Sequence, residues 1–600
     1  MPKWLKYCGA SVFLLGSIHC NPNSNPSNDN RLLNNIDTLK ATVVSSGQQA
    51  SIAELKAELL TLWDWTEQGQ KPLDIEIVTT EIKNGYKIEG LYFNGYGDSK
   101  GQDRIFCYYA RPEKIEGKIP VHIELTGGAE PEACLWMTKA YKCAIMNFEW
   151  RATKNRFRSK WACKELGSMK DLTFLKQNAA FRIVTGIRRS IDFLAQQSAL
   201  DMDRLSCGGG SMGGYYTMLS AGVDQRIRFG MNELGGGYLS NTDSSLGGFK
   251  LDPERKQIWI QAFDPYTYAG KTKATIRTHL SANDYFFWLG DVVENYKALN
   301  GEKSLCISPN YNHNDGAFGR KKYDSNGWLD YCFGFESNFP KISALKNEGL
   351  SYTVTLDSTT QASEVKLLWS PGVKVIWPAR YWVEVNCVKT AKGWTAELPA
   401  SYAKLSRMVF ATASDAKGRV VSCEPMLTKG DDPQDGPSPL WPEGQIWDAK
   451  AGVSAWRLIG PNVHSGCAGV ELTSFGMKGI TLKPKGPKNS FSLVTNSLIL
   501  ASGSASLQAG LKMGIDGNGK SGKLKVTLVR NFGAASQQQE FLCEVNYNAS
   551  FASYELPWEN FKAFQASSSM FPFESLRLDG ESPDGTALTI SSLDFMPTAR

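Results

Sequence analysis

Residues 209–213 (GGSMG) match the pattern GxSxG, which can present a serine for nucleophilic attack. The chemistry requires Ser211 on a tight turn between a strand and a helix, because the flanking glycines let the backbone turn sharply and expose the hydroxyl. An apolar run at 205–207 precedes the motif, and an apolar, helix-like stretch begins at residue 215. The sequence therefore predicts Ser211 as the nucleophile of an acyl-transfer reaction.

A serine nucleophile needs a base, and the chain has five histidines. His313 lies in a loop just after a predicted strand at 304–308, where its side chain can reach back toward Ser211. The other four lie in the N-terminal apolar segment, inside predicted strands or in a distant β-rich region; they are His19, His122, His279 and His464. We therefore expect His313 to be the base.

The third member of such a site is a carboxylate that orients the imidazole. Asp284 stands just past a predicted strand at 274–280, and the chain order Ser211, Asp284, His313 is the order that α/β-hydrolases use. Glu233 follows the preceding strand and is the alternative acid, although it can instead bond backbone amides of the glycine loop after it. The pattern favours Asp284.

Backbone N–H groups should stabilise the oxyanion of such a reaction. The N–H of Met212, next to the nucleophile, is one expected donor. The second should come from the loop after an early strand at 121–126, where glycines allow close approach to a substrate. This predicts Gly128 or Ala129.

Two other motifs carry no chemistry in their context. Residues 97–101 (GDSKG) also match GxSxG, but Ser99 lies in a polar turn between two predicted strands. Residues 514–521 match the phosphate-loop pattern GxxxxGK[ST], yet a strand follows at 524–529 where a phosphate loop needs a helix. The pairs Asp-Gly and Asn-Gly within that segment predict hairpin turns. No dense cluster of metal ligands appears, and we predict neither a metal nor another cofactor.

Strands and helices alternate up to residue 345, which is typical of a mostly parallel sheet covered by helices on both faces. An amphipathic helix is predicted over 180–194, where apolar residues recur at three- and four-residue spacing. The predicted strands are 86–93, 104–110, 121–126, 143–148, 205–207, 227–231, 274–280 and 304–308. The fold class is therefore α/β, with a catalytic domain at 37–345 that includes an N-terminal helical extension.

Helical periodicity fades beyond residue 345 and alternating apolar runs take its place. The pattern predicts a small Ig-like β-sandwich at 346–427, a linker rich in proline and glycine at 428–444, and an all-β domain at 445–600.

The N-terminus has the pattern of an export signal. Lys3 and Lys6 precede an uncharged stretch at 7–18 that is too short to span a bilayer, which predicts a signal peptide at 1–20. The polar tract that follows, at 21–36, is typical of a flexible tether between the signal and the folded domain. The arrangement resembles a bacterial lipoprotein signal, in which Cys20 would carry the lipid, with ordinary signal cleavage as the alternative. We expect an exported protein of the periplasm or the cell surface.

Composition excludes several classes of protein. Hydrophobic residues make up 42% of 600 residues, which is too apolar for a disordered chain, and a net charge of +6 is too small for a nucleic-acid binder. Thirteen cysteines form no CxxC pair, so a zinc ribbon and a thioredoxin-like motif are also excluded. Some cysteines of an exported protein can form disulfides, and at least one should remain a buried thiol.

The segment at 75–345 resembles the acetylxylan esterase and cephalosporin deacetylase branch of the α/β-hydrolases, and more closely the exported PhoPQ-activated pathogenicity-related proteins. The resemblance rests on residues 209–214 (GGSMGG), 282–287 (ANDYFF) and 301–313, which end in PNYNH. It implies Ser211, Asp284 and His313 as nucleophile, acid and base. The oxyanion loop departs from the family by reading Thr-Gly-Gly instead of His-Gly-Gly. The domain at 445–600 is similar to a carbohydrate-binding jelly roll.

Together these features predict an exported serine esterase that removes acetyl groups from a polysaccharide or oligosaccharide. Two alternatives remain. A peptidase or glucuronoyl-type esterase could use the same three residues, and a glycan-binding protein could carry an inactive hydrolase domain. Five tryptophans lie in segments that could reach the site and stack on sugar rings, with core packing as their other role: Trp136, Trp150, Trp161, Trp259 and Trp288.

Overall fold

The computed structural model describes most of the chain between residues 50 and 596. The described residues are 50–99, 101–150, 157–162, 172–237, 251–284, 286–309, 313, 317–371, 377, 382–398, 400, 403–430, 445–448, 456–458, 470–476, 479–484, 490–495, 509–530, 539–563, 575–581 and 585–596. The predicted signal peptide, Cys20 and the tether lie outside them, as do residues 431–444 of the predicted linker. Within the described part of the chain, no helix is long and apolar enough to cross a membrane.

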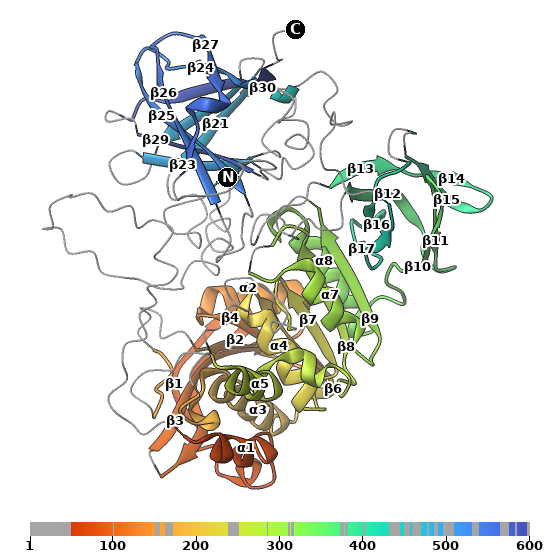
Figure 1. The fold of residues 1–600 in the computed structure, drawn as a ribbon. Helices are drawn as coiled ribbons and strands as arrows, with labels where there is room; N and C mark the ends of the chain where they lie inside the picture. Colours follow the sequence, from red (N-terminus) through yellow and green to blue (C-terminus); the bar gives the residue numbers. More distant parts are fainter. Residues whose placement is uncertain are drawn as a thin grey trace, which may run out of the picture.

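A nine-stranded sheet forms the centre of the first domain, in the order β1-β2-β3-β5-β4-β6-β7-β8-β9 (Figure 1). Its first three strands pair antiparallel, and β3 also pairs antiparallel with β5, whereas β5, β4 and β6 to β9 run parallel. The strands are β1 (Glu76–Lys83), β2 (Tyr86–Asp98), β3 (Gly101–Pro112), β4 (Ile119–Gly127), β5 (Ala144–Glu149), β6 (Leu200–Gly210), β7 (Phe229–Glu233), β8 (Thr275–Ser281) and β9 (Lys303–Ser308). This is an α/β-hydrolase fold, as predicted.

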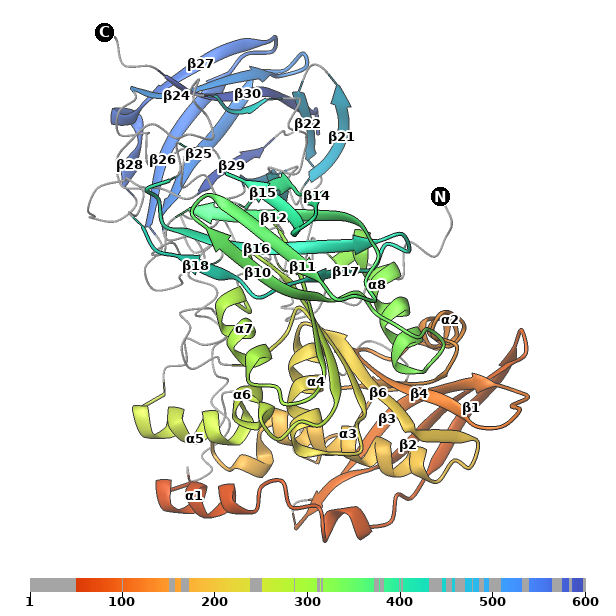
Figure 2. The same cartoon turned by 90° about the vertical axis from the view of Figure 1, so that its right-hand side faces the viewer.

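Helices cover both faces of this sheet (Figure 2). Helices α2 and α8 pack against each other and the sheet, while α3 and α4 pack on strands from the other side, with α6 beside α4 and α7 beside α6. Strand β5 shows the division, because Ala144 and Met146 enter one core and Ile145 enters the other. The helices are α1 (Ile52–Leu60), α2 (Pro131–Tyr141), α3 (Ala179–Ala195), α4 (Met212–Val223), α5 (Pro253–Phe263), α6 (Pro265–Ala269), α7 (Leu289–Lys297) and α8 (Ala317–Cys332).

Helix α3 is the amphipathic helix that the sequence predicts over 180–194, but nearly all of its residues are buried, those of its polar face included. The N-terminal extension supplies the cover. Arg188 donates to the carbonyl of Trp63, and Arg189 donates to those of Gln68 and Lys71. Polar residues on the outer face of α3 are thus buried but bonded, which removes most of the cost of burying them.

Two antiparallel sheets follow, consistent with a β-sandwich. Their orders are β10-β11-β15-β14 and β13-β12-β16-β17, and β18 pairs with β16. This middle domain contacts the hydrolase domain directly, since Arg277 Nη2 donates to the carbonyl of Val420 at 2.7 Å and the Ser422 hydroxyl accepts from Ile307 N at 2.8 Å. The strands are β10 (Ile342–Glu348), β11 (Ser351–Leu356), β12 (Ala362–Pro371), β13 (Val383–Asn386), β14 (Val388–Thr390), β15 (Gly393–Glu397), β16 (Arg407–Asp415), β17 (Val420–Ser422) and β18 (Met426–Thr428).

The C-terminal region contains two further antiparallel sheets, β21-β22-β30-β24-β27 with β19 beside β30, and β20-β23-β29-β25-β26-β28. The phosphate-loop match falls between β24 and β25, so a strand follows it as expected. The prediction of a hairpin there is wrong, because β24 and β25 belong to different sheets and the turn joins the two layers. The strands are β19 (Gln445–Asp448), β20 (Trp456–Leu458), β21 (Val470–Gly476), β22 (Gly479–Pro484), β23 (Ser490–Thr495), β24 (Gly510–Asp516), β25 (Gly522–Arg530), β26 (Gln539–Tyr547), β27 (Ala552–Pro557), β28 (Lys562–Ala563), β29 (Ser575–Glu581) and β30 (Leu588–Met596).

Candidate active site

Ser211 lies at the sharp turn between β6 and α4, with φ 58° and ψ −118°. A residue with a side chain is strained at positive φ, so neighbouring contacts must hold it there. The Ser211 N–H donates to the carbonyl of Glu233 at the end of β7, at 2.7 Å. This bond ties the turn to the adjacent strand.

Glycine is required at several positions around Ser211, because a Cβ there would collide with neighbouring atoms. A Cβ on Gly209 or Gly213 would collide with the carbonyl oxygen of Leu125 at the end of β4. A Cβ on Gly235, in the loop after β7, would lie 2.5 Å from the Ser211 carbonyl oxygen. Gly208 to Gly210 form the end of β6 and not a loop. Because these residues have no side chains, β4 and β7 can approach the turn closely.

His313 is hydrogen-bonded to both of its predicted partners. Its Nε2 lies 2.8 Å from the Ser211 hydroxyl, and its Nδ1 lies 2.7 Å from Asp284 Oδ2. An ionised carboxylate only accepts hydrogen bonds, so Nδ1 carries the proton and Nε2 presents its lone pair to the serine. The structure thus joins the residues predicted as nucleophile, base and acid in one hydrogen-bonded series.

The surroundings of Asp284 fix its carboxylate. Its Oδ1 accepts the N–H of Phe286 at 2.8 Å and that of Phe287 at 3.0 Å, so one oxygen is held by the backbone and the other is left for His313. The side chain is almost completely buried. Both phenylalanine rings also pack on the imidazole, with centroids 4.9 Å and 6.1 Å away. Sequence reasoning missed this support, although an aspartate before an Asx turn is a recognisable signal.

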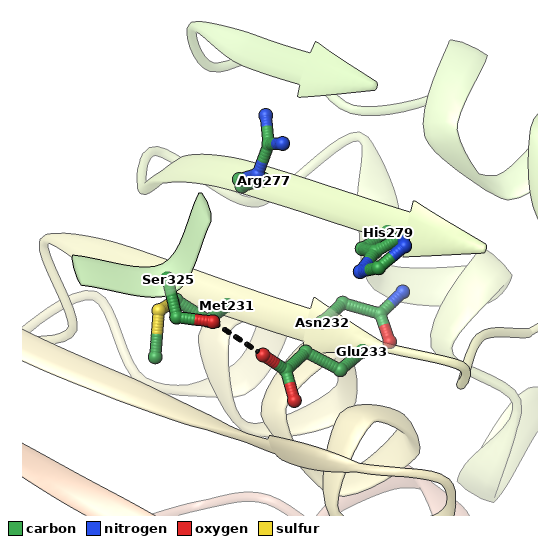
Figure 3. A pocket seen from close by; sticks show the side chains of 6 residues that line it. All are labelled: Met231, Asn232, Glu233, Arg277, His279 and Ser325. Carbon is green, nitrogen blue, oxygen red and sulfur yellow. Dashed lines mark hydrogen bonds between the residues drawn. The ribbon is translucent and has the colours of Figure 1, made fainter. Parts of the chain in front are cut away.

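Glu233, the alternative acid, has a different partner. Its Oε1 accepts the hydroxyl of Ser325 in α8 at 2.7 Å (Figure 3), so the bond ties the helix that follows His313 to the end of β7, where the Glu233 carbonyl bonds Ser211. Glu233 also lines a small polar cavity of about 10 Å³ with His279 and Arg277, which is room for about one water.

The other described histidines are buried in strands and hydrogen-bonded there. His279 lies in β8 and bonds Ser308 through Nε2 at 3.0 Å. His122 lies fully buried in β4 between Ser206 and Glu124. His19 and His464 lie outside the described residues. Ser99 lies in the exposed β2–β3 turn.

The predicted oxyanion donors lie at two adjoining chain segments. Met212 is the first residue of α4, and the first N–H groups of a helix have no partner within it. Gly128 and Ala129 follow β4, whose Leu125 carbonyl contacts the glycines of the Ser211 turn. The Thr126 hydroxyl donates to the Gly128 carbonyl at 2.7 Å, and the trans peptide then directs the Ala129 N–H the opposite way. The assignment of these N–H groups as oxyanion donors stays a prediction.

Three of the five tryptophans considered for sugar stacking serve the core instead. Trp150, Trp259 and Trp288 are buried. Trp161 is half-buried, and only Trp136, on α2, is substantially exposed, at 38%. The nine described cysteines are all free thiols, eight of them buried; Cys163 and Cys467 lie outside the described residues. No group of three metal-ligating side chains occurs among the described residues.

Residues 249–371 match the family described as PhoPQ-activated pathogenicity-related protein, a range that includes Asp284 and His313. No curated protein sequence matches the chain. Among solved structures, acetyl xylan esterase 1 from Thermoanaerobacterium sp. is 16% identical, with a TM-score of 0.37, and covers 48% of this chain and 96% of its own. The acetyl xylan esterase from Paenibacillus sp. R4 is 16% identical, with a TM-score of 0.36 and coverage of 45% and 97%.

A peptidase also appears among these structures. The acylaminoacyl peptidase of Pyrococcus horikoshii is 16% identical, with a TM-score of 0.33, and covers 44% of this chain and 51% of its own. The strand order, the strand directions and the place of Ser211 at the β6–α4 turn make this chain an α/β-hydrolase by fold, and it resembles the PhoPQ-activated pathogenicity-related proteins over residues 249–371.

Proposed function

We propose that the chain is a serine hydrolase that cleaves carboxylic esters, and that its substrate is an acetylated polysaccharide or oligosaccharide. The observation that carries the proposal is the hydrogen-bonded series from Ser211 through His313 to Asp284. Burial of Asp284 and the strained serine turn further support it, because such features persist where function requires them.

The reaction follows from this geometry. His313 Nε2 takes the proton of the Ser211 hydroxyl as Oγ attacks the ester carbonyl, and Asp284 stabilises the imidazolium that forms. The Met212 N–H and a donor from Gly128 or Ala129 would bind the oxyanion. The bond between the carbonyl carbon and the sugar oxygen then breaks, His313 gives its proton to that oxygen so that it departs as a hydroxyl, and the acetyl group stays on Ser211. Water, deprotonated by His313, releases acetate and restores Ser211.

The resemblance to acetylxylan esterases and the N-terminal signal pattern support the finer parts of the proposal. They favour an acetyl group as the acyl part, and export to the periplasm or cell surface with Cys20 as the residue that would carry a lipid. The C-terminal β domain would then hold the enzyme on the glycan. No cofactor is included in the proposal.

Acetate release from a panel of acetylated polysaccharides tests the proposal. The wild type should release acetate and the Ser211→Ala variant should not, while the matched Ser99→Ala variant, at the other GxSxG sequence, should behave as wild type. Acetate without Ser211 would refute the mechanism. Cleavage of a peptide or a glucuronoyl ester, with no acetate from any glycan, would assign the same residues to another substrate. No labelling of Ser211 by a fluorophosphonate would favour a glycan-binding protein.

A further inference from the structure

The middle β-sandwich has an open groove of about 670 Å³ at one of its ends. The groove lies where the end of β11 and the start of β12 meet the β14–β15 hairpin, and these elements group together in Figure 2. It belongs to a different domain from Ser211 and shares no residue with the candidate active site. Nothing in the proposed reaction uses it.

An aromatic ring forms part of the floor of this groove. Trp394 stands opposite Val354 on β11 and opposite Lys389 on β14, so the three side chains share one face of the sheet. Val354 is fully buried, which identifies that face as the inner one. Trp394 is only half-buried and lines the groove with Leu356. Trp394 and Leu356 therefore leave an apolar surface partly exposed to solvent at this end of the sandwich.

The rim of the groove is positively charged. Lys389 and Lys392 are both exposed and both line it, and no aspartate or glutamate does. Neither ammonium is paired with a carboxylate in the described part of the chain. Asp357, in the adjoining turn, is occupied by the N–H and hydroxyl of Thr359. The lining thus carries two uncompensated positive charges beside an aromatic ring.

We propose that this groove binds an acidic polysaccharide, one whose sugar rings carry carboxylate groups. A pyranose ring has an apolar face that can pack on Trp394, and two lysines beside that ring suit the carboxylates of neighbouring residues in the polymer. The exposed amide of Gln361 can bond sugar hydroxyls. An open groove, unlike a closed pocket, also allows a polymer to continue past both ends.

The test measures binding and not turnover. The full chain carrying Ser211→Ala is run in native gels that contain polygalacturonate or, in parallel, neutral dextran. Polygalacturonate should retard the protein and dextran should not, and added salt should weaken the retardation because exposed charges are screened. Because this background has no nucleophile, the outcome does not depend on whether the proposed esterase activity is correct.

Variants then locate the site. Lys389→Glu combined with Lys392→Glu should weaken binding roughly tenfold or more, since two attractive charges become repulsive. Trp394→Leu, which keeps an apolar side chain, should weaken it as well. The control Lys114→Glu with Lys118→Glu makes the same charge change in the exposed β3–β4 loop and should bind as the parent does. Thermal melting establishes that each variant is folded.

Three outcomes would overturn the proposal. The first is no retardation by polygalacturonate. The second is equal retardation by dextran, which would indicate another ligand chemistry. The third is retention unchanged in the folded Lys389→Glu, Lys392→Glu variant, which would place any binding elsewhere in the chain.

Discussion

Replacing Asp284 by asparagine tests the role of the buried carboxylate with little change in shape. In the wild type, Oδ1 accepts two backbone N–H groups and Oδ2 accepts the proton on His313 Nδ1. An asparagine can keep the first pair of bonds only by placing its oxygen at Oδ1. Its NH₂ group then faces His313 Nδ1, and two donors cannot face each other.

The imidazole must respond by changing its tautomer. Nδ1 becomes the acceptor and Nε2 carries the proton, so the nitrogen next to the Ser211 hydroxyl can no longer take a proton. A change of this kind lowers kcat by about 10⁴-fold, equivalent to about 5 kcal/mol of transition-state stabilisation. The fold should be little affected, because the backbone bonds at Oδ1 survive.

Hydrolysis of para-nitrophenyl acetate measures the effect, with thermal melting to establish that the variant is folded. Glu233→Gln is the matched control, because Glu233 is the alternative acid and bonds Ser325 instead of His313. We expect it to retain most of the activity. A loss of less than tenfold for Asp284→Asn, or a larger loss for Glu233→Gln, would refute the assignment of the acid.

Three further predictions concern packing, charge and thiols. Gly235→Ala places a Cβ against the Ser211 carbonyl and should lower kcat by about 100-fold, while Gly270→Ala, whose Cβ would make only ordinary van der Waals contacts at 3.9 Å and 4.0 Å, should not; equal kcat values would contradict this account. Burial alone would raise the pKa of Asp224, but the bonds and charge of Arg226 outweigh burial and hold that pKa below its usual value. Its stabilising effect is therefore present above the unfolded-state pKa of about 3.9 and is lost as the pH falls through the folded value. Asp224→Asn should cost about 3–5 kcal/mol near pH 7 and less in acid, as measured by urea unfolding at several pH values; a cost independent of pH would be inconsistent with this pairing. Burial also raises the pKa of most described thiols, so iodoacetamide should label them only after unfolding, and rapid labelling of the native protein would contradict their burial.

Local patterns were sufficient for the elements that carry the site. The strand before Ser211, the helix after it and the strands before Asp284 and His313 all appear where the apolar runs predict them. These features depend on residues adjacent in the chain, since a strand alternates with period two and glycines mark the turn. The chain order of the three side chains also limited which residues could meet.

Contacts between segments far apart in the chain decided which carboxylate bonds the histidine and which helix faces are buried, neither of which the local sequence patterns could predict. Glu233 and Asp284 follow neighbouring strands and looked alike in sequence, but only Asp284 meets His313, and the place of α8 gives Glu233 another partner. The same holds for helix α3, whose polar face is buried because the N-terminal extension covers it.

The sequence by itself therefore determined the α/β class, the strands and the helix that carry the site, and the places of the three side chains along the chain. The tertiary structure alone decided the strand order, which tryptophans are buried, that the turn after β24 joins two sheets, and which carboxylate bonds the histidine. The physical reason is that periodicity and turn chemistry are local, whereas strand neighbours and side-chain partners depend on packing between segments far apart in the chain.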